Sequence, residues 1–392
     1  MTGGLRFTVV SRIFRPEPSA ASFRLGALVD ALRRDGNEVD VLTVAAPQAV
    51  PDEVPGLRVR RWPVLRDRSG YVRGYIQYLS FDVPAFFRVL LGRRPSVVVA
   101  EPPPTTGAVV RLACAVRRVP YVYYAADIWS DASAGTGSPR AVVAVLRAVE
   151  RWAMQGAARV IAVNEEVAER VRELGARRVE VVRNGIDTEV FRPDGDLVED
   201  APSGPYAVYA GTTSEWQGAE VFVDAMAVVR PDVPDATLVF LGQGSAWESL
   251  RARAGSLPDG GACVRMVGQV PAPRAAAWLR GAVAGVVSLK PGQGYDLAFP
   301  TKIFAAVASG TPVLYAGPGR AREVVERERL GRAVEHDVAE VADALRTLFT
   351  APAPSLDERE RLHDWARANA SVRRTGERAA AVVLAAAVGS RG

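Results

Sequence analysis

Three short segments in the second half of the chain combine glycine, hydroxyl or lysine residues with a strand end or a helix start. They are Gly211-Thr212-Thr213, Gly242-Gln243-Gly244 and Pro300-Thr301-Lys302. Glycine turns expose backbone N–H groups, and a helix that begins at Thr301 would direct its positive end and the Lys302 ammonium the same way. Such groups can hold a diphosphate without a metal, so the sequence predicts an anion site here.

Lysine is rare in this chain. Only Lys290 and Lys302 are lysines among the 49 basic residues, and both fall within one short segment. An ammonium is a compact, mobile charge, whereas a guanidinium is a planar fork. We therefore interpret the segment that contains both lysines as a candidate functional site.

Histidine and cysteine are too scarce to indicate a metal centre. His336 and His363 both lie late in the sequence, and Cys114 and Cys263 are far apart in apolar surroundings. Neither a Cys/His metal site nor a Ser-His-Asp triad assembles from a local cluster. We expect two free core thiols, no bound metal and no cofactor.

The elements that must position these residues alternate between strand and helix. Apolar runs at 5–11 and 39–44 flank an amphipathic helix at 23–34, which Ser19 or Ser22 could cap. The alternation continues to about residue 182 and restarts at 206. It predicts two α/β domains with doubly wound parallel sheets, which bind ligands at the carboxyl ends of their strands.

Composition predicts the domain boundaries. We expect an N-terminal domain over 1–192, a polar linker over 193–205 and a C-terminal domain over 206–369, with a C-terminal helix at about 370–392 packed back on the first domain. No run reaches the ~20 apolar residues of a membrane span, and the N-terminus is typical of a strand and not of a signal peptide. A cytoplasmic location is expected.

The segment VVRNGIDTEVFRP at 181–193 resembles the end of the first domain in the retaining glycosyltransferases of family GT4, which have the GT-B fold. Other segments similar to a bacterial branch of that family are EPPPTTG at 101–107, ADIW at 126–129, Gln217-Gly218, PTKIF at 300–304 and ASGTPV at 308–313. The resemblance implies two Rossmann-like domains that face a central cleft. The first domain would bind the acceptor and the second the donor.

The resemblance also implies an activity: transfer of a sugar from a UDP- or GDP-linked donor to an acceptor, with retention of anomeric configuration and without a metal. Protein cations would stabilise the departing diphosphate. We expect Asp127 and Lys302 to be catalytic. The expected donor site comprises Gly211, Thr212, Thr213, Gln217, Gly242, Gly244, Lys290, Asp296, Pro300, Thr301 and Lys302, and the expected acceptor site comprises Arg15, Ser19, Arg24, Asp127 and Trp129.

Two positions depart from the family pattern. The glutamates of its Glu-x7-Glu pair, the second of which holds the donor ribose, align with Leu297 and Ala305, so Asp296 is a candidate substitute. The usual diphosphate-binding arginine and lysine are replaced by residues 215–217, which leaves that role to Lys290 or Lys302. A nucleotide-sugar epimerase of the same fold and a nucleotide-sugar binder without transfer activity are the alternatives.

The expected partners are a nucleotide-sugar donor and a small-molecule or lipid-linked saccharide acceptor. The stretch 58–87 mixes arginines with aromatic residues. We favour a pair of helices, partly core and partly surface, and a peripheral membrane or lipid-carrier face is the alternative. Nucleic acid is not expected, because no nucleic-acid-binding module frames the stretch. The sequence leaves the oligomeric state open.

Overall fold

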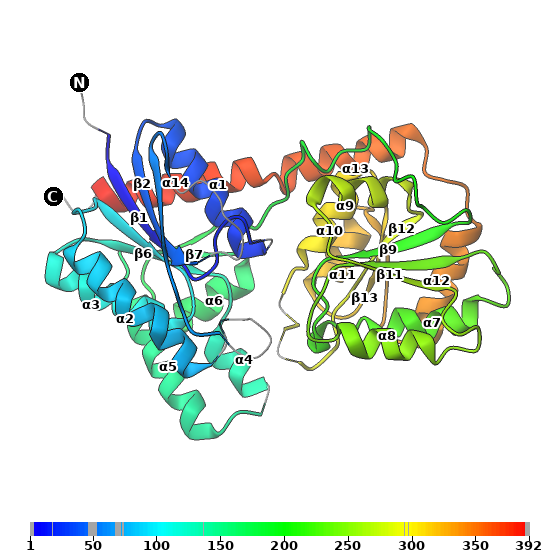
Figure 1. Ribbon diagram of the computed structural model, residues 1–392, viewed down its shortest axis with the longest axis horizontal. Coiled ribbons are helices and arrows are strands. Elements are labelled where there is room, and N and C mark those ends of the chain that lie inside the picture. The colour runs from blue at the N-terminus through cyan, green and yellow to red at the C-terminus, as the bar shows by residue number, and fades with distance from the viewer. Residues whose placement is uncertain are drawn as a thin grey trace. The chain divides into compact units, whose positions relative to one another are not determined.

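The chain forms two compact units (Figure 1). The structure is a computed structural model, and it describes residues 4–17, 19–45, 53–66, 72, 74–135, 137–293, 295–296 and 298–388. Unit 1 comprises Met1–Gly185 together with Val372–Gly392, and unit 2 comprises Ile186–Ser371. The C-terminal segment thus belongs to the same unit as the N-terminus. No helix in the described ranges combines the length and the apolar character needed to cross a membrane.

Unit 1 is built on an eight-stranded sheet with the order β3-β4-β2-β1-β5-β6-β7-β8. Short β3 pairs antiparallel with β4, and the other pairs are parallel. Strand order reverses between β1 and β5, which is where ligands bind in doubly wound sheets. The strands are β1 (Arg6–Val10), β2 (Glu38–Val44), β3 (Glu53–Val54), β4 (Leu57–Trp62), β5 (Val97–Ala100), β6 (Tyr121–Ala125), β7 (Arg159–Ala162) and β8 (Val179–Val181).

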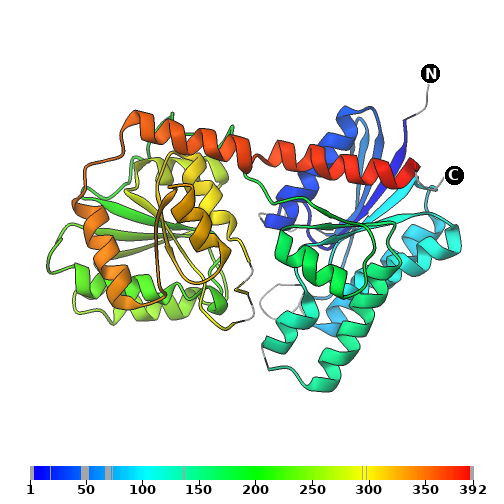
Figure 2. The ribbon, with the colours of Figure 1, turned by 180° about the vertical axis from the view of Figure 1, so that it is seen from behind.

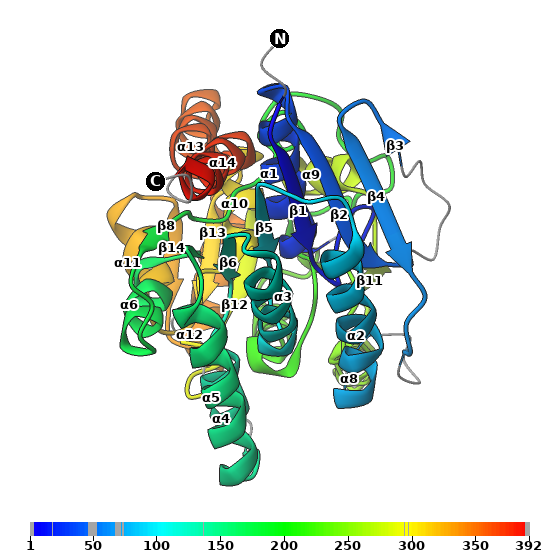
Figure 3. The same ribbon diagram turned by 90° about the vertical axis from the view of Figure 1, so that its left-hand side faces the viewer.

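Helices cover both faces of this sheet, because successive strand residues point to opposite sides. Val9 and Val99 pack under α1 and α14, whereas Val10 and Val98 pack under α2, α3 and α5. Figures 2 and 3 show the helices on the two faces of the sheet. A Cβ at Gly376 would overlap the carbonyl oxygen of Ala27, so glycine allows α14 to approach α1 closely. The helices are α1 (Ala20–Arg34), α2 (Tyr75–Leu91), α3 (Pro104–Arg117), α4 (Trp129–Gly135), α5 (Arg140–Gln155), α6 (Glu165–Glu173) and α14 (Val372–Val388).

Unit 2 contains a six-stranded parallel sheet with the order β11-β10-β9-β12-β13-β14. Its strand order reverses between β9 and β12. The strands are β9 (Tyr206–Ala210), β10 (Thr237–Leu241), β11 (Val264–Gly268), β12 (Ala284–Ser288), β13 (Val313–Ala316) and β14 (Gly331–Val334). The two sheets confirm the predicted α/β class.

The helices of unit 2 also form two layers. Helices α7, α8 and α12 pack on one face of the sheet, and α9, α10, α11 and α13 pack on the other. Their bounds are α7 (Glu220–Val229), α8 (Trp247–Gly255), α9 (Ala272–Gly281), α10 (Thr301–Ala308), α11 (Arg320–Arg327), α12 (Val338–Thr350) and α13 (Leu356–Asn369), and a short 3₁₀ turn, η1, spans Glu215–Gln217.

The division between the units lies earlier than the sequence suggests. Phe191 packs in the core of unit 2, with Ile186 and Val190 against the same core, so the chain joins unit 2 well before residue 193. The expected linker also contacts unit 2, since Asp200 pairs with Arg265 at 2.7 Å. The apparent linker composition reflects a surface segment that is fixed to one unit by ion pairs.

The helix pair expected over 58–87 is wrong in its first half. Leu57–Trp62 forms strand β4, paired with β2, and helix α2 begins at Tyr75. The strand signal is the alternation of the buried Val59 with the part-exposed Arg58 and Arg60, which has a period of two.

Candidate functional site

Two glycine-rich loops lie against each other at the carboxyl ends of β9 and β10. The Thr213 N–H donates to the carbonyl of Gln243 at 2.9 Å. Gly242 and Gly244 have φ values of 149° and 153°, and a Cβ at either would overlap the carbonyl oxygen of Gly211 or Thr213 respectively. Only glycine permits this approach of the two backbones. The glycine pattern thus forms one rigid edge.

Lys302 lies beside the first of these loops. Helix α10 begins at Thr301, directly after Pro300. A Cβ added to Gly211 would lie 3.1 Å from Lys302 Cε and 3.7 Å from its Nζ, and Nζ is 5.0 Å from the centre of the Tyr209 ring. The structure therefore brings the first turn of α10, its lysine and the Gly211 loop together.

Burial lowers the pKa of Lys302 to about 7, and no acidic side chain in the described ranges contributes to the shift. Lys302 is half-buried, and an ammonium that has lost part of its water without gaining a carboxylate partner is unfavourable unless an anion neutralises it. The helix start adds partial positive charge to the same place. This arrangement is suited to bind a phosphate group.

Lys290 and Gln217 are engaged within the protein instead. The Lys290 Nζ lies 3.2 Å from Glu220 Oε1. Gln217 Oε1 accepts from the Tyr209 hydroxyl at 2.9 Å and from the Ser214 N–H at 3.1 Å. Gln217 thereby fixes the loop after β9, and Lys290 is neutralised by its partner, so the two lysines have different environments.

The remaining donor-site candidates differ in their exposure and in their contacts. Thr212 is exposed, whereas Thr213 is buried, and its hydroxyl has no hydrogen-bond partner in the described chain. Asp296 Oδ1 accepts from the Gly292 N–H at 3.2 Å, so this carboxylate shapes its own loop. Ala305 packs in the core of unit 2, and Leu297 lies outside the described residues. The structure shows no carboxylate at the position of the second family glutamate.

Aromatic stacking joins the loop after β9 to the loop after β12. Trp216 and Tyr295 stack with ring centroids 4.2 Å apart and an interplanar angle of 24°, and the Lys290 N–H donates to the Trp216 carbonyl at 3.0 Å. These contacts hold two of the loops at the strand ends of unit 2 in one fixed arrangement.

A second polar cluster lies at the carboxyl ends of β1 and β5 in unit 1. Buried Glu101 accepts from the Ser11 hydroxyl and pairs with the guanidinium of Arg24, which comes from α1. Arg24 also lies 5.5 Å from the centre of the Tyr124 ring. Arg24 is held by Glu101 at the switch point of the sheet, while its Nε has no hydrogen-bond partner among the described residues.

Asp127 follows β6 close to this cluster. Its side chain reaches solvent, yet the surrounding protein replaces enough water to raise the pKa of its carboxyl, with Arg24 opposing and Glu101 reinforcing the shift. Burial also lowers the pKa of Arg12, whose guanidinium lies 4.2 Å from the centre of the Tyr78 ring. A carboxyl, a guanidinium and aromatic rings therefore surround the strand ends of unit 1.

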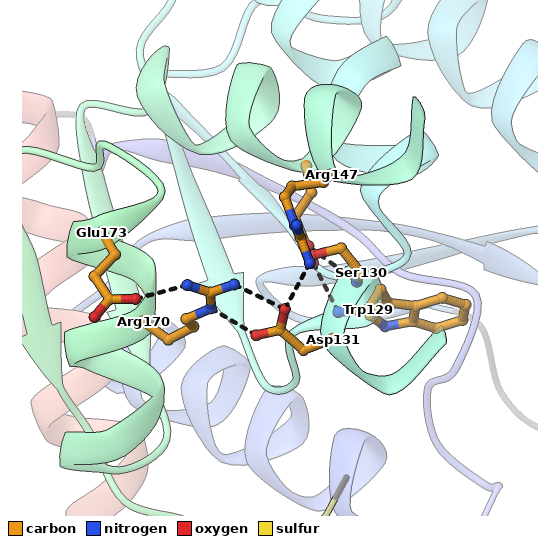
Figure 4. Close-up of polar contacts among 7 residues, drawn as sticks. Trp129, Ser130, Asp131, Arg147, Arg170 and Glu173 are labelled. Carbon is orange, nitrogen blue, oxygen red and sulfur yellow. Dashed lines mark hydrogen bonds and ion pairs between the residues drawn. The ribbon is translucent and has the colours of Figure 1, made fainter. Parts of the chain in front are cut away.

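Trp129 begins α4, and polar contacts fix that helix in place (Figure 4). The Trp129 N–H donates to Glu150 Oε1 at 2.8 Å. Asp131 pairs with Arg170 at 2.6 Å and with Arg147 at 3.3 Å. The Trp129 ring also makes an edge contact with Tyr78, with centroids 5.8 Å apart. The indole is consequently presented on a rigid support.

Arg15 and Ser19, two of the expected acceptor ligands, make contacts that stabilise helix α1. Arg15 pairs with Asp30 on α1 at 2.8 Å. The Ser19 side chain accepts from the Ser22 N–H at 3.1 Å and so caps α1; it is one of the two caps that the sequence allowed. Sequence reasoning missed Ser11, Glu101 and Glu150 as site residues. Glu101 had a signal, since it directly follows an apolar strand.

No group of three or more His, Cys, Asp or Glu side chains in the described ranges is arranged to hold a metal ion. Cys114 and Cys263 are buried free thiols, as predicted, and burial raises the pKa of each to about 12. Their thiols are thus protonated at neutral pH.

Two family models match the chain. The glycosyl transferase 4-like domain matches residues 20–185, and the glycosyl transferases group 1 domain matches residues 204–351. Among curated proteins, the D-inositol 3-phosphate glycosyltransferase of Jonesia denitrificans is 32% identical over 202 residues, which are 46% of this chain and 46% of that protein. The corresponding protein of Paenarthrobacter aurescens is 29% identical over 213 residues, 51% of each chain. The matches thus cover about half the length of these relatives.

Solved structures resemble the chain along almost its whole length. Anabaena HepE, crystallised in complex with UDP and glucose, has a TM-score of 0.70 at 16% identity, covering 97% of this chain and 100% of that chain. Sucrose-phosphate synthase from Thermosynechococcus elongatus has a TM-score of 0.69 at 18% identity, covering 98% and 97%. At these identities the likeness shows a shared fold.

Proposed function

Because the chain belongs to the GT4-type glycosyltransferases with the GT-B fold, we propose that it transfers a sugar from a nucleoside diphosphate sugar to a hydroxyl of an acceptor. Unit 2 binds the donor and unit 1 the acceptor. The observation that carries the proposal is the Lys302 amino group, which lies beside the Gly211 loop without a carboxylate partner in the described chain.

The proposed chemistry uses this cation at the leaving group. The bond between the sugar C1 and the phosphate oxygen breaks, and its electron pair stays on the diphosphate. The Lys302 ammonium and the first N–H groups of α10 stabilise that charge. The acceptor oxygen bonds to C1 on the same face, and its proton passes to the departing phosphate, so configuration is retained. No metal takes part in this scheme.

The departures from the family pattern in the donor site agree with this role of Lys302. Lys302 takes the role of the arginine and lysine that the family usually places near residues 215–217, and Lys290 stays paired with Glu220. We propose a UDP-sugar as the first donor to test, because HepE was crystallised with UDP and glucose. GDP-sugars are the second.

The acceptor is proposed to bind near Arg12, Asp127 and Trp129. Trp129 offers an aromatic surface for a sugar or polyol ring, and Asp127 and Arg12 offer polar contacts. The two curated relatives are named for D-inositol 3-phosphate, so this compound belongs in the acceptor panel with lipid-linked and soluble saccharides. A cytoplasmic location is part of the proposal, and cell fractionation tests it.

The test incubates the protein with UDP-glucose, UDP-N-acetylglucosamine or GDP-mannose and the acceptor panel, with and without EDTA. Nucleotide release and product mass are both measured. We expect one nucleoside diphosphate per glycosylated product, unchanged by EDTA. Lys302→Ala is expected to lower the rate by roughly a hundredfold or more, whereas Lys290→Ala stays within about threefold. An epimerised donor without nucleotide release, or a bound donor that is never consumed, would contradict transfer.

A further inference from the structure

Helix α2 is apolar on both faces, although the described chain covers only one of them. Phe81, Ala85 and Val89 pack into the core of unit 1. The opposite face consists of large apolar side chains with exposed fractions from 49% to 78%, namely Ile76, Leu79, Val83, Phe87 and Leu91. They recur every three or four residues and so form one continuous stripe along the helix.

Neighbouring helices extend this surface. Helix α3 packs between α2 and α5 (Figure 3). Leu112 and Val116 are exposed on α3, at 50% and 64%, and Val145 and Trp152 are exposed on α5, at 65% and 42%. Soluble proteins rarely expose apolar side chains over several adjacent helices, so the layer indicates a surface that contacts something apolar.

The same layer is basic and lacks exposed acids. In α2, α3 and α5 the only carboxylates are Asp82 and Glu150, and each is 0% exposed. The three helices carry six arginines, Arg88, Arg111, Arg117, Arg140, Arg147 and Arg151. Arg147 pairs with Asp131 of α4, and the half-buried Arg88, Arg111 and Arg117 donate to backbone carbonyls. Arg140 and Arg151 are exposed. The whole chain has 44 acidic and 49 basic residues, so this imbalance belongs to the layer and not to the overall composition.

We propose that this apolar-basic face, made of the outer surfaces of α2, α3 and α5, docks unit 1 on an anionic lipid bilayer. The α2 stripe would enter the boundary between headgroups and acyl chains, and the exposed Arg140 and Arg151 of α5 would contact lipid phosphates. A second copy of the chain fits poorly, since it would set arginines against arginines with no exposed carboxylate between them. The inference does not depend on the proposed transfer reaction.

Vesicle flotation tests the inference with the full chain. Vesicles contain phosphatidylcholine alone or phosphatidylcholine with phosphatidylglycerol. We expect binding to the anionic vesicles, weakened by high salt, and little binding to phosphatidylcholine alone. Leu79→Gln with Phe87→Gln should lower the bound-to-free ratio by roughly tenfold or more. Arg140→Gln with Arg151→Gln should lower it by several-fold on anionic vesicles.

A matched control removes equally exposed apolar side chains from unit 2. Leu197 and Leu356 are 59% and 78% exposed, and Leu197→Gln with Leu356→Gln should bind vesicles like the parent. All variants alter exposed residues, so their melting temperatures should match that of the parent. Failure of the parent to float with anionic vesicles would overturn the proposal. So would vesicle binding equal to that of the parent by both the Leu79→Gln/Phe87→Gln and the Arg140→Gln/Arg151→Gln variants. A dimer that the Leu79→Gln/Phe87→Gln pair dissociates, without vesicle binding by the parent, would instead identify a self-association face.

Discussion

The Lys302 amino group lies 5.0 Å from the centre of the Tyr209 ring, at the carboxyl end of β9. The ring is fixed because the Tyr209 hydroxyl donates to Gln217 at 2.9 Å. A cation over an aromatic face is stabilised weakly compared with one beside a carboxylate. With its pKa lowered to about 7, Lys302 is about half neutral at neutral pH. A bound diphosphate would supply the missing negative charge.

Affinity for UDP should therefore fall as the pH rises above about 7. Only the ammonium form attracts the diphosphate, and the free protein loses that form as the pH passes the lowered pKa of Lys302, about 7. The expected loss is about tenfold per pH unit until the pKa of the complex is reached. Calorimetry in two buffers of different ionisation enthalpy should also detect proton uptake on binding. Lys302→Arg, which stays charged, is the control and should bind without this pH dependence.

Replacing Lys302 by methionine should stabilise the ligand-free protein. The folded pKa of about 7 lies below the unfolded value of about 10.4, so between these pH values the unfolded chain binds more protons and the parent gains stability as the pH rises. Below about pH 7 the full penalty of the partly desolvated ammonium is present. Lys302→Met should raise the free energy of unfolding there by ~1–3 kcal/mol, a range discounted for the partial exposure of the side chain. Urea denaturation should show a smaller gain near pH 9, and a less stable variant at both pH values would contradict the expectation.

Gly244→Ala should destabilise unit 2 and weaken nucleotide binding. The new Cβ would overlap the Thr213 carbonyl oxygen, at a residue whose φ is 153°. We expect a loss of about 2–4 kcal/mol in the free energy of unfolding. Gly255→Ala is the matched control, because nothing lies within 4 Å of its added Cβ and it ends helix α8. An equal effect of the two substitutions on urea denaturation would show that the loop contact is not rigid.

Removing the carboxylate of Glu101 should be costly for unit 1. Glu101→Ala leaves the Arg24 guanidinium buried without its partner, and breaking a buried pair in this way costs about 3–5 kcal/mol. Glu101→Leu combined with Arg24→Met should recover much of the loss. Arg34→Ala removes the exposed pair with Glu377 and should cost less than about 1 kcal/mol. Chemical denaturation compares the four proteins, and a small effect of Glu101→Ala would refute the burial argument.

The positions of the backbone turns could be predicted from the sequence better than the roles of side chains. Gly211, Gly242 and Gly244 follow apolar strands, and strand periodicity places such residues at one edge of a parallel sheet. Ser19 and Gln217 were assigned to ligands, yet both cap helical turns in their own units. Residue type alone does not distinguish a hydrogen bond to the backbone from one to a ligand.

Ion pairs between residues that are far apart in the chain could not be predicted from the sequence. The Glu101–Arg24 pair joins residues 77 apart in the chain, and the contrast between Lys290 and Lys302 depends on Glu220, which comes from helix α7. Strand β4 was missed because its arginines resembled a surface helix, although their alternation with Val59 has a strand period. Apolar periodicity reports burial on one element, whereas ion pairs depend on how the elements pack.

Calorimetric titration of UDP and GDP into the parent, Lys302→Ala and Lys290→Ala tests the central claim most directly. The account predicts micromolar or tighter binding of one nucleotide by the parent, a loss of roughly a hundredfold in Lys302→Ala, and a change within about threefold in Lys290→Ala. Equal binding by the parent and Lys302→Ala, or no binding of either nucleotide by the parent, would contradict it.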